Sequence, residues 1–131
     1  MEINKMEKRI LLVDDSRFVR NTTKKILIDL GHDESIIFEA ASGEEALDLY
    51  EKENPDLIFL DLLMPGIGGE AVLQKIREKD QNCFIAVISS NFQKPVQERV
   101  FQTGANLFIE KTITPEKLTE ILESYDASRK V

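Results

Sequence analysis

The 131-residue sequence is poor in the residues that build disulfide scaffolds and zinc sites. It contains one cysteine, Cys83, and one histidine, His32, so an internal disulfide is excluded and a zinc centre is disfavoured. A lone cysteine favours a reducing compartment, and we expect a cytoplasmic protein. No apolar run approaches the roughly 20 residues that span a bilayer, and residues 1–9 lack the apolar stretch of a signal peptide. His32 follows Gly31, which favours an exposed loop.

The sequence also lacks an excess of basic residues. Lys and Arg total 17 against 24 Asp and Glu, which gives a formal net charge of -7. Because nucleic-acid affinity depends on cations that neutralise phosphates, this balance argues against DNA as a partner, and it argues against a membrane surface as well. The expected partners are proteins, with a metal ion if the acidic residues converge.

Short apolar runs alternate with amphipathic segments of helical length. The runs are nearly unbroken, as is typical of strands that are covered on both faces. They are Ile10–Val13, Ile36–Phe38, Leu57–Leu60, Phe84–Ile88 and Leu107–Ile109. The chain is long enough for one domain, and its 42% hydrophobic and 31% charged residues are typical of a globular protein with one core.

The segments between these runs carry helix signals. In the first, Phe18, Thr22, Ile26 and Leu30 recur every four residues and predict the buried face. In the second, Ser42 and Glu45 form a capping-box pattern. The third is expected at about 69–79 and the fourth from about Pro95 to Gly104. The fifth begins at Thr114 and Pro115, a typical cap and first helical position.

Successive strand–helix units predict an α/β fold with a parallel sheet and helices on both faces. In such sheets a ligand site forms beyond the carboxyl ends of the strands. The residues at those ends are polar: Asp14 and Asp15 after the first strand, Asp61 after the third, Ser89 after the fourth and Lys111 after the fifth. We therefore expect one site that contains three carboxylates, a hydroxyl and an ammonium.

That combination favours magnesium and phosphoryl chemistry. Two carboxylates about 4 Å apart repel by about 4 kcal/mol at an effective dielectric constant of 20, so either a proton or a cation must lie among the three. An all-oxygen site suits Mg²⁺ better than zinc. A carboxylate beside Mg²⁺ and a lysine is well placed to attack a phosphoryl group, and the product would be an aspartyl phosphate.

At these residues the sequence resembles the receiver domains of response regulators, especially stand-alone chemotaxis-type (CheY-like) receivers. The resemblance spans roughly Arg9 to Ser124, and together its motifs are highly specific. It implies a flavodoxin-like five-stranded sheet of order 2-1-3-4-5, with an N-terminal extension at 1–8, the receiver at 9–125 and a short tail at 126–131. The matching stretches are Ile10–Ser16, Pro55–Asp61 with Met64–Gly66, Val87–Ser90, and Gly104–Ala105 leading to Lys111.

The resemblance assigns a role to each matching position. Asp61 corresponds to the phosphoacceptor, and Asp15 to the direct metal ligand. Asp14 corresponds to the acid that reaches the metal chiefly through water. Leu63 corresponds to the residue whose backbone carbonyl binds the metal, and Ser89 to the switch hydroxyl.

Two further positions complete the implied function. Lys111 corresponds to the phosphate-binding lysine and Phe108 to the aromatic switch residue. A sensor histidine kinase or phosphotransfer protein would phosphorylate the chain in two-component or chemotaxis-type signalling. A change of the surface formed by the fourth helix, fifth strand and fifth helix would reach an unidentified protein target. As a signalling protein, the chain would catalyse only its own phosphoryl transfer and the hydrolysis of the aspartyl phosphate.

Two positions depart from the family pattern or vary within it. The family usually has proline after the lysine, often through a cis bond, whereas Thr112 follows Lys111 here. Because a non-proline cis bond costs about 2.5–4 kcal/mol, we expect the Lys111–Thr112 bond to be trans. The apolar Leu63 side chain cannot hydrogen-bond an attacking water, which predicts slow self-dephosphorylation.

Two other classes of function compete with this interpretation. A phosphohydrolase of the haloacid-dehalogenase type also forms an aspartyl phosphate, but it normally carries a second Asp where this chain has Leu63. A pseudo-receiver would act only by binding partners, which the complete set of acids and lysine disfavours. No effector segment is recognised after the receiver region, so we expect output through a partner or an adaptor role.

Overall fold

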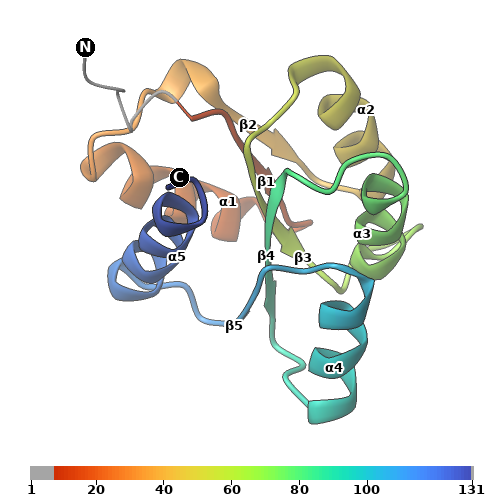
Figure 1. Cartoon of the computed structure of the whole chain (residues 1–131). Helices are drawn as coiled ribbons and strands as arrows, with labels where there is room; N and C mark the ends of the chain where they lie inside the picture. Colours follow the sequence, from red (N-terminus) through yellow and green to blue (C-terminus); the bar gives the residue numbers. More distant parts are fainter. Residues whose placement is uncertain (1–7, 131) are drawn as a thin grey trace.

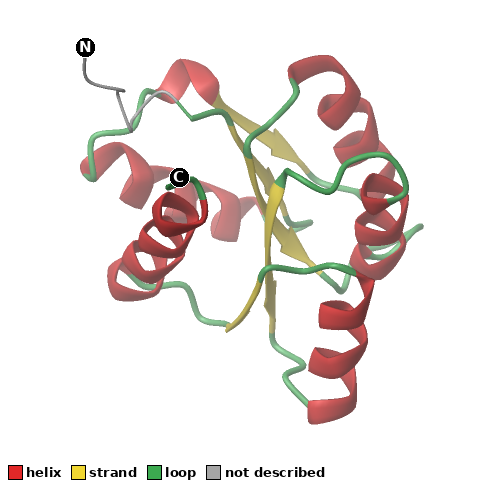
Figure 2. Ribbon diagram, in the orientation of Figure 1, coloured by secondary structure: helices red, strands yellow, loops and turns green. Residues whose placement is uncertain are grey.

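The structure is a computed structural model, and residues 8–130 of it are described. Its centre is a five-stranded parallel sheet of order β2-β1-β3-β4-β5, which confirms the predicted fold class and strand order (Figures 1 and 2). The strands are β1 (Ile10–Val13), β2 (Ile37–Ala40), β3 (Leu57–Asp61), β4 (Phe84–Ser89) and β5 (Leu107–Glu110). The bounds of β1 agree with the prediction, and β3, β4 and β5 each end one residue later than expected. The β2 strand begins one residue later and ends two residues later than expected.

Helices cover both faces of this sheet. Figure 1 shows α1 and α5 on one side and α2, α3 and α4 on the other. Their bounds are α1 (Arg17–Asp29), α2 (Gly43–Glu53), α3 (Gly69–Arg77), α4 (Lys94–Thr103) and α5 (Pro115–Ser128), with a short 3-10 helix, η2 (Glu34–Ile36), before β2. The α5 helix therefore continues into the segment expected to be a tail. Among the described residues, no helix is long and apolar enough to cross a membrane.

Alternate side chains of the strands build two cores. One core contains Val13, Leu60 and Val87 under α2–α4, and the other contains Leu12, Phe59 and Ile88 under α1 and α5. All residues of β1, β3 and β4 are buried, as the unbroken apolar runs predicted. The three central strands are thus held on both faces, and their carboxyl ends are fixed relative to one another.

The helix caps follow the sequence signals. The Ser42 hydroxyl accepts from the Glu45 amide at 3.1 Å, and the Thr114 hydroxyl accepts from the Lys117 amide at 3.2 Å. The α4 helix ends at Gly104, whose φ of 124° lies in a region that favours glycine. These local signals were sufficient to predict the helix ends, because a cap depends on residues only three or four positions apart.

The predicted buried face of α1 is wrong at both ends, although Ile26 packs, partly buried, against the core under α1 and α5. Phe18 is 78% exposed and Leu30 is 38% exposed, whereas Thr23 and Leu27 are buried. A helix turns about 100° per residue, so residues spaced by four drift about 40° at each step and sweep around the axis. His32 is also buried rather than exposed, because the chain turns inward after Gly31 and the His32 amide donates to the Leu27 carbonyl at 3.0 Å.

Candidate functional site

Lys111 joins two acids at the carboxyl edge of the sheet. Its Nζ lies 2.7 Å from Asp14 Oδ2 and 3.5 Å from Asp61 Oδ1. Asp14 follows β1, Asp61 ends β3 and Lys111 follows β5, so three separate strand ends supply these groups. The side chains of Asp14 and Asp61 are only 8% and 6% exposed, so water screens their charges little. The structure therefore brings together the acids and the lysine that the sequence placed at these ends.

Asp15 completes an acidic cluster. One carboxylate oxygen from each of Asp14, Asp15 and Asp61 lies within 4.8 Å of the other two. Asp15 is exposed, unlike its two neighbours, so the cluster opens to solvent on its side. Three oxygen donors on one open edge match the preference of Mg²⁺ for carboxylate and water ligands. The donor set fits this ion.

The charges of this cluster are only partly balanced. Burial away from water, together with the negative charge of Asp14, raises the pKa of the Asp61 carboxyl to about 6 from an ordinary value of 3.8. Burial alone would lower the pKa of Lys111, but its hydrogen bond to Asp14 and the charge of Asp61 outweigh burial and raise it. Lys111 therefore stays protonated, and its single positive charge contacts two of the three carboxylates of the cluster.

Ser89 lies at the end of β4 on the same edge. It is fully buried, and its hydroxyl accepts a hydrogen bond from the Asn91 amide at 3.0 Å. Its carbonyl accepts from the Lys111 amide, also at 3.0 Å. Phe108 is half-buried against the core under α2–α4 and pairs in register with Val87, two residues before Ser89. Ser89 and Phe108 therefore lie toward the same face of adjacent strands.

Leu63 lies in the loop after β3 and is 63% exposed. Its amide makes a long contact of 3.4 Å with Asp61 Oδ1. The apolar side chain is therefore largely in solvent, while the backbone of Leu63 lies beside the Asp61 carboxylate.

Gly69 is a positioning residue that the sequence analysis did not identify. A Cβ at this position would overlap with the backbone carbonyl oxygen of Asp61. The Gly69 amide donates to the Leu62 carbonyl at 3.1 Å, so the start of α3 packs directly on the end of β3. Only glycine permits this approach. The sequence showed a glycine at the expected helix start but gave no sign of what it contacts.

The prediction of a trans Lys111–Thr112 bond is wrong, because this peptide bond is cis. The prediction weighed only the intrinsic preference of an isolated bond. In the structure, Lys117 Nζ donates to the Glu110 carbonyl at 2.7 Å and to the Thr112 carbonyl at 3.0 Å. The Lys111 amide is bound to Ser89 as well. Contacts from α5 and β4 thus fix the path of this loop.

Comparisons with known proteins identify the family of this chain. Residues 10–123 match the model of the response regulator receiver domain. The chain is 33% identical over 117 residues to the chemotaxis protein CheY of Thermotoga maritima. The match covers 89% of this chain and 96% of that protein. It is 38% identical over 123 residues to the nitrate/nitrite response regulator protein NarL of Escherichia coli K12. That match covers 93% of this chain but only 56% of NarL.

Solved structures show the same likeness. The crystal structure of the CheX–CheY–BeF3–Mg²⁺ complex from Borrelia burgdorferi superposes with a TM-score of 0.83 at 32% identity, covering 89% of this chain and 87% of that one. The response regulator TrrA from Thermotoga maritima, in complex with Mg²⁺–BeF, gives a TM-score of 0.79 at 31% identity, covering 90% and 98%. This chain belongs to the response regulator receiver domain family of two-component and chemotaxis signalling.

Proposed function

We propose that this chain is a receiver that is switched by phosphorylation of Asp61. The observation that carries the proposal is the convergence of Asp14, Asp15, Asp61 and Lys111 on one edge of the sheet. The donor would be a phosphohistidine of a sensor histidine kinase or of a phosphotransfer protein. The net charge of -7 favours protein partners over DNA or a membrane surface, and we expect the chain to act in the cytoplasm.

Mg²⁺ would be held by the carboxylates of Asp14, Asp15 and Asp61 together with the backbone carbonyl of Leu63. The oxygen donors and the only partly compensated charge on Asp61 support this assignment. When bound, the ion would neutralise charge on the phosphoryl oxygens. Mg²⁺ would also favour the ionised form of Asp61, which is the form that attacks.

The transfer needs an ionised carboxylate with an open line of attack. A carboxylate oxygen of Asp61 would form a bond to phosphorus while the phosphorus–nitrogen bond of the phosphohistidine breaks. The histidine nitrogen would keep the bonding electron pair and take up a proton. Because the pKa of Asp61 is about 6 even without a metal ion, most of this carboxyl is ionised at pH 7.

Lys111 and Ser89 would detect the product. Lys111 bonds more closely to Asp14 than to Asp61, so a phosphoryl group on Asp61 would compete for its ammonium. The buried Ser89 hydroxyl accepts from Asn91, and its own proton could be donated to a phosphoryl oxygen. Movement of Ser89 would make room for Phe108 on the same face of the sheet. The surface formed by α4, β5 and α5 would then change and reach a protein target.

Transfer of a radiolabelled phosphoryl group tests this function. The native chain is incubated with a small labelled acyl-phosphate donor, with Mg²⁺ or with a chelator. Asp61→Asn is compared with Asp48→Asn, which removes an exposed carboxylate of α2. We expect Mg²⁺-dependent labelling of the native chain and of the Asp48 variant only. Labelling of Asp61→Asn would contradict the assignment of the acceptor, and no labelling of any protein would favour the pseudo-receiver.

A second assay separates the receiver from a phosphohydrolase. A receiver turns over only its own aspartyl phosphate, so the native chain should leave a panel of phosphate monoesters intact. Catalytic release of phosphate from any of these monoesters would instead favour the haloacid-dehalogenase interpretation.

A further inference from the structure

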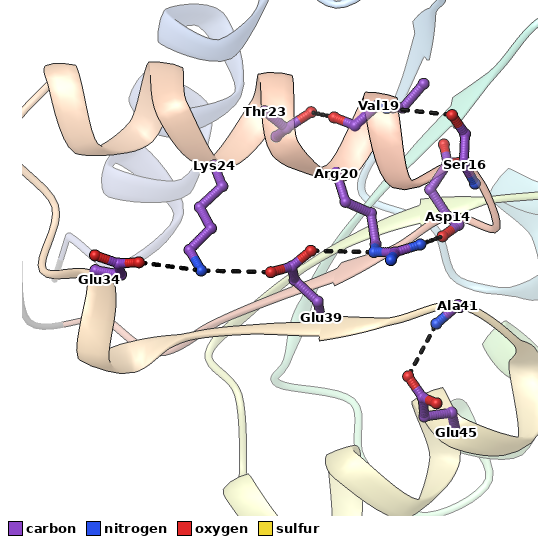
Figure 3. Close-up of polar contacts among 10 residues, drawn as sticks. All are labelled: Asp14, Ser16, Val19, Arg20, Thr23, Lys24, Glu34, Glu39, Ala41 and Glu45. Atoms are coloured by element: carbon purple, nitrogen blue, oxygen red, sulfur yellow. Dashed lines mark hydrogen bonds and ion pairs between the residues drawn. The ribbon is translucent and has the colours of Figure 1, made fainter.

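We propose that Arg20 is a positioning residue for the acidic site, although it touches none of the three carboxylates. Its guanidinium donates from Nη1 to the backbone carbonyl of Asp14 at 2.8 Å and from Nε to Glu39 Oε1 at 3.1 Å (Figure 3). Arg20 lies in the first turns of α1, Asp14 follows β1 and Glu39 lies on β2. One side chain therefore fixes the β1–α1 turn against a neighbouring strand.

The bonded carbonyl belongs to the peptide unit that leads into Asp15. Because a peptide unit is planar, a hydrogen bond to the Asp14 oxygen also fixes the plane that contains the Asp15 nitrogen and Cα. On the other side of Asp14, its amide donates to the Ala40 carbonyl of β2 at 3.1 Å. Both backbone groups of Asp14 are thus anchored, one through Arg20 and one through β2.

Asp15 depends on this anchoring more than Asp14 does. The Asp14 carboxylate accepts from the Ser16 amide at 2.9 Å and from Lys111 Nζ at 2.7 Å. Among the described residues, the exposed side chain of Asp15 makes no such contact, yet one of its oxygens lies in the acidic cluster. The backbone that Arg20 holds therefore sets the starting point and direction of the Asp15 side chain that carries this oxygen.

Arg20 is itself held in place. The second oxygen of Glu39 contacts Lys24 Nζ at 3.4 Å, and Lys24 also contacts Glu34 Oε1 at 3.3 Å (Figure 3). The side chains of Arg20, Lys24 and Glu39 are 13%, 23% and 28% exposed, so solvent screens this network only in part. Oppositely charged partners on a helix and a strand keep the guanidinium aimed at the Asp14 carbonyl.

This inference rests on the proposed function, because it assigns Arg20 a role in binding Mg²⁺ to the same acids. Partners that orient metal ligands typically change metal affinity by about 10–100-fold when they are removed. Since Arg20 acts on a backbone group rather than on a ligand side chain, we expect the lower limit. Arg20→Met should weaken Mg²⁺ binding about 10-fold.

Arg9 provides a matched control. It also binds a backbone carbonyl and a carboxylate, with Nε 2.7 Å from the Glu53 carbonyl and Nη2 2.8 Å from Glu53 Oε1. It precedes β1 at the opposite end of the strand from the acids. Arg9→Met should lower the stability of the fold as Arg20→Met does, but it should leave the Mg²⁺ affinity unchanged. A merely structural role for Arg20 would make the two variants alike.

The experiment is an NMR titration of each ¹⁵N-labelled chain with Mg²⁺ alone. The amide signals of Asp15 and Leu63 report binding, and urea unfolding without Mg²⁺ reports stability. Glu39→Gln serves as a second variant that keeps Arg20 but weakens its anchor, and it should weaken Mg²⁺ binding less than Arg20→Met. This variant also decides the matter if Arg20→Met does not fold.

The outcomes separate this inference from the proposed function. Weaker Mg²⁺ binding by the Arg20 and Glu39 variants, with native affinity in Arg9→Met, would support it. If the native chain binds Mg²⁺ and becomes phosphorylated while the Arg20 and Glu39 variants keep native affinity, the role of Arg20 is refuted and the proposed function stands. If the native chain does not bind Mg²⁺, both fail.

Discussion

The Asp61 carboxylate should destabilise the metal-free fold, so its removal should stabilise the protein. Asp61 is 5% exposed. Lys111 Nζ lies 3.5 Å from Asp61 Oδ1 but is bound more closely to Asp14, at 2.7 Å from Oδ2. The ionised form is therefore buried beside another negative charge with only partial compensation. Asp61→Asn keeps nearly the same shape and removes the charge.

The pKa of Asp61 sets the magnitude and the sign of this effect. The carboxyl has a pKa of about 6 in the folded chain against an ordinary value of 3.8. Each pKa unit corresponds to about 1.4 kcal/mol, so the upper limit is about 3 kcal/mol, and partial solvation of the site reduces it to about 1–2 kcal/mol. Because the folded chain holds this proton more tightly, the contribution of the Asp61 carboxyl to stability is greatest below about pH 4 and is lost as the pH rises through about 6.

Thermal unfolding followed by circular dichroism measures the difference. In a chelating buffer at pH 7.5, Asp61→Asn should unfold about 4–8 °C above the native chain, and this gap should shrink towards zero near pH 4. Saturating Mg²⁺ should stabilise the native chain more than the variant and narrow the gap at pH 7.5. Equal melting temperatures at pH 7.5, or a gap that does not depend on pH, would refute the reasoning.

Three further substitutions test separate parts of the structure. Leu63→Asn places a hydrogen-bonding group beside Asp61 and should speed the decay of the Asp61 phosphate, whereas Leu63→Ile should not. If Leu63→Asn leaves the decay rate unchanged, the apolar Leu63 side chain is not the cause of slow hydrolysis. Arg77→Met removes a buried guanidinium that donates to three acceptors, and urea unfolding should show that the free energy of unfolding falls by about 2–4 kcal/mol. A fall of less than about 1 kcal/mol would show that water replaces the guanidinium at these acceptors. Gly69→Ala should displace the end of β3 and lower both stability and Mg²⁺ affinity; native affinity would mean that α3 moves instead.

The fold class and most residues of the candidate site could be predicted from the pattern of amino acids. Unbroken apolar runs predict buried parallel strands, and such strands end at one edge of the sheet, so Asp14, Asp61 and Lys111 were expected on that edge. Helix caps such as Thr114 were equally predictable. All of these inferences use either neighbouring residues or a rule that holds for every sheet of this kind.

The contacts between individual side chains could be seen only in the folded chain. The sequence did not indicate that Lys111 bonds mainly to Asp14, that Gly69 packs on the Asp61 carbonyl, or that Arg20 holds the peptide before Asp15. It predicted the wrong face of α1 and the wrong isomer of the bond after Lys111. These features depend on the rotation of a helix about its axis and on contacts between residues distant in the chain, neither of which is fixed by a local pattern.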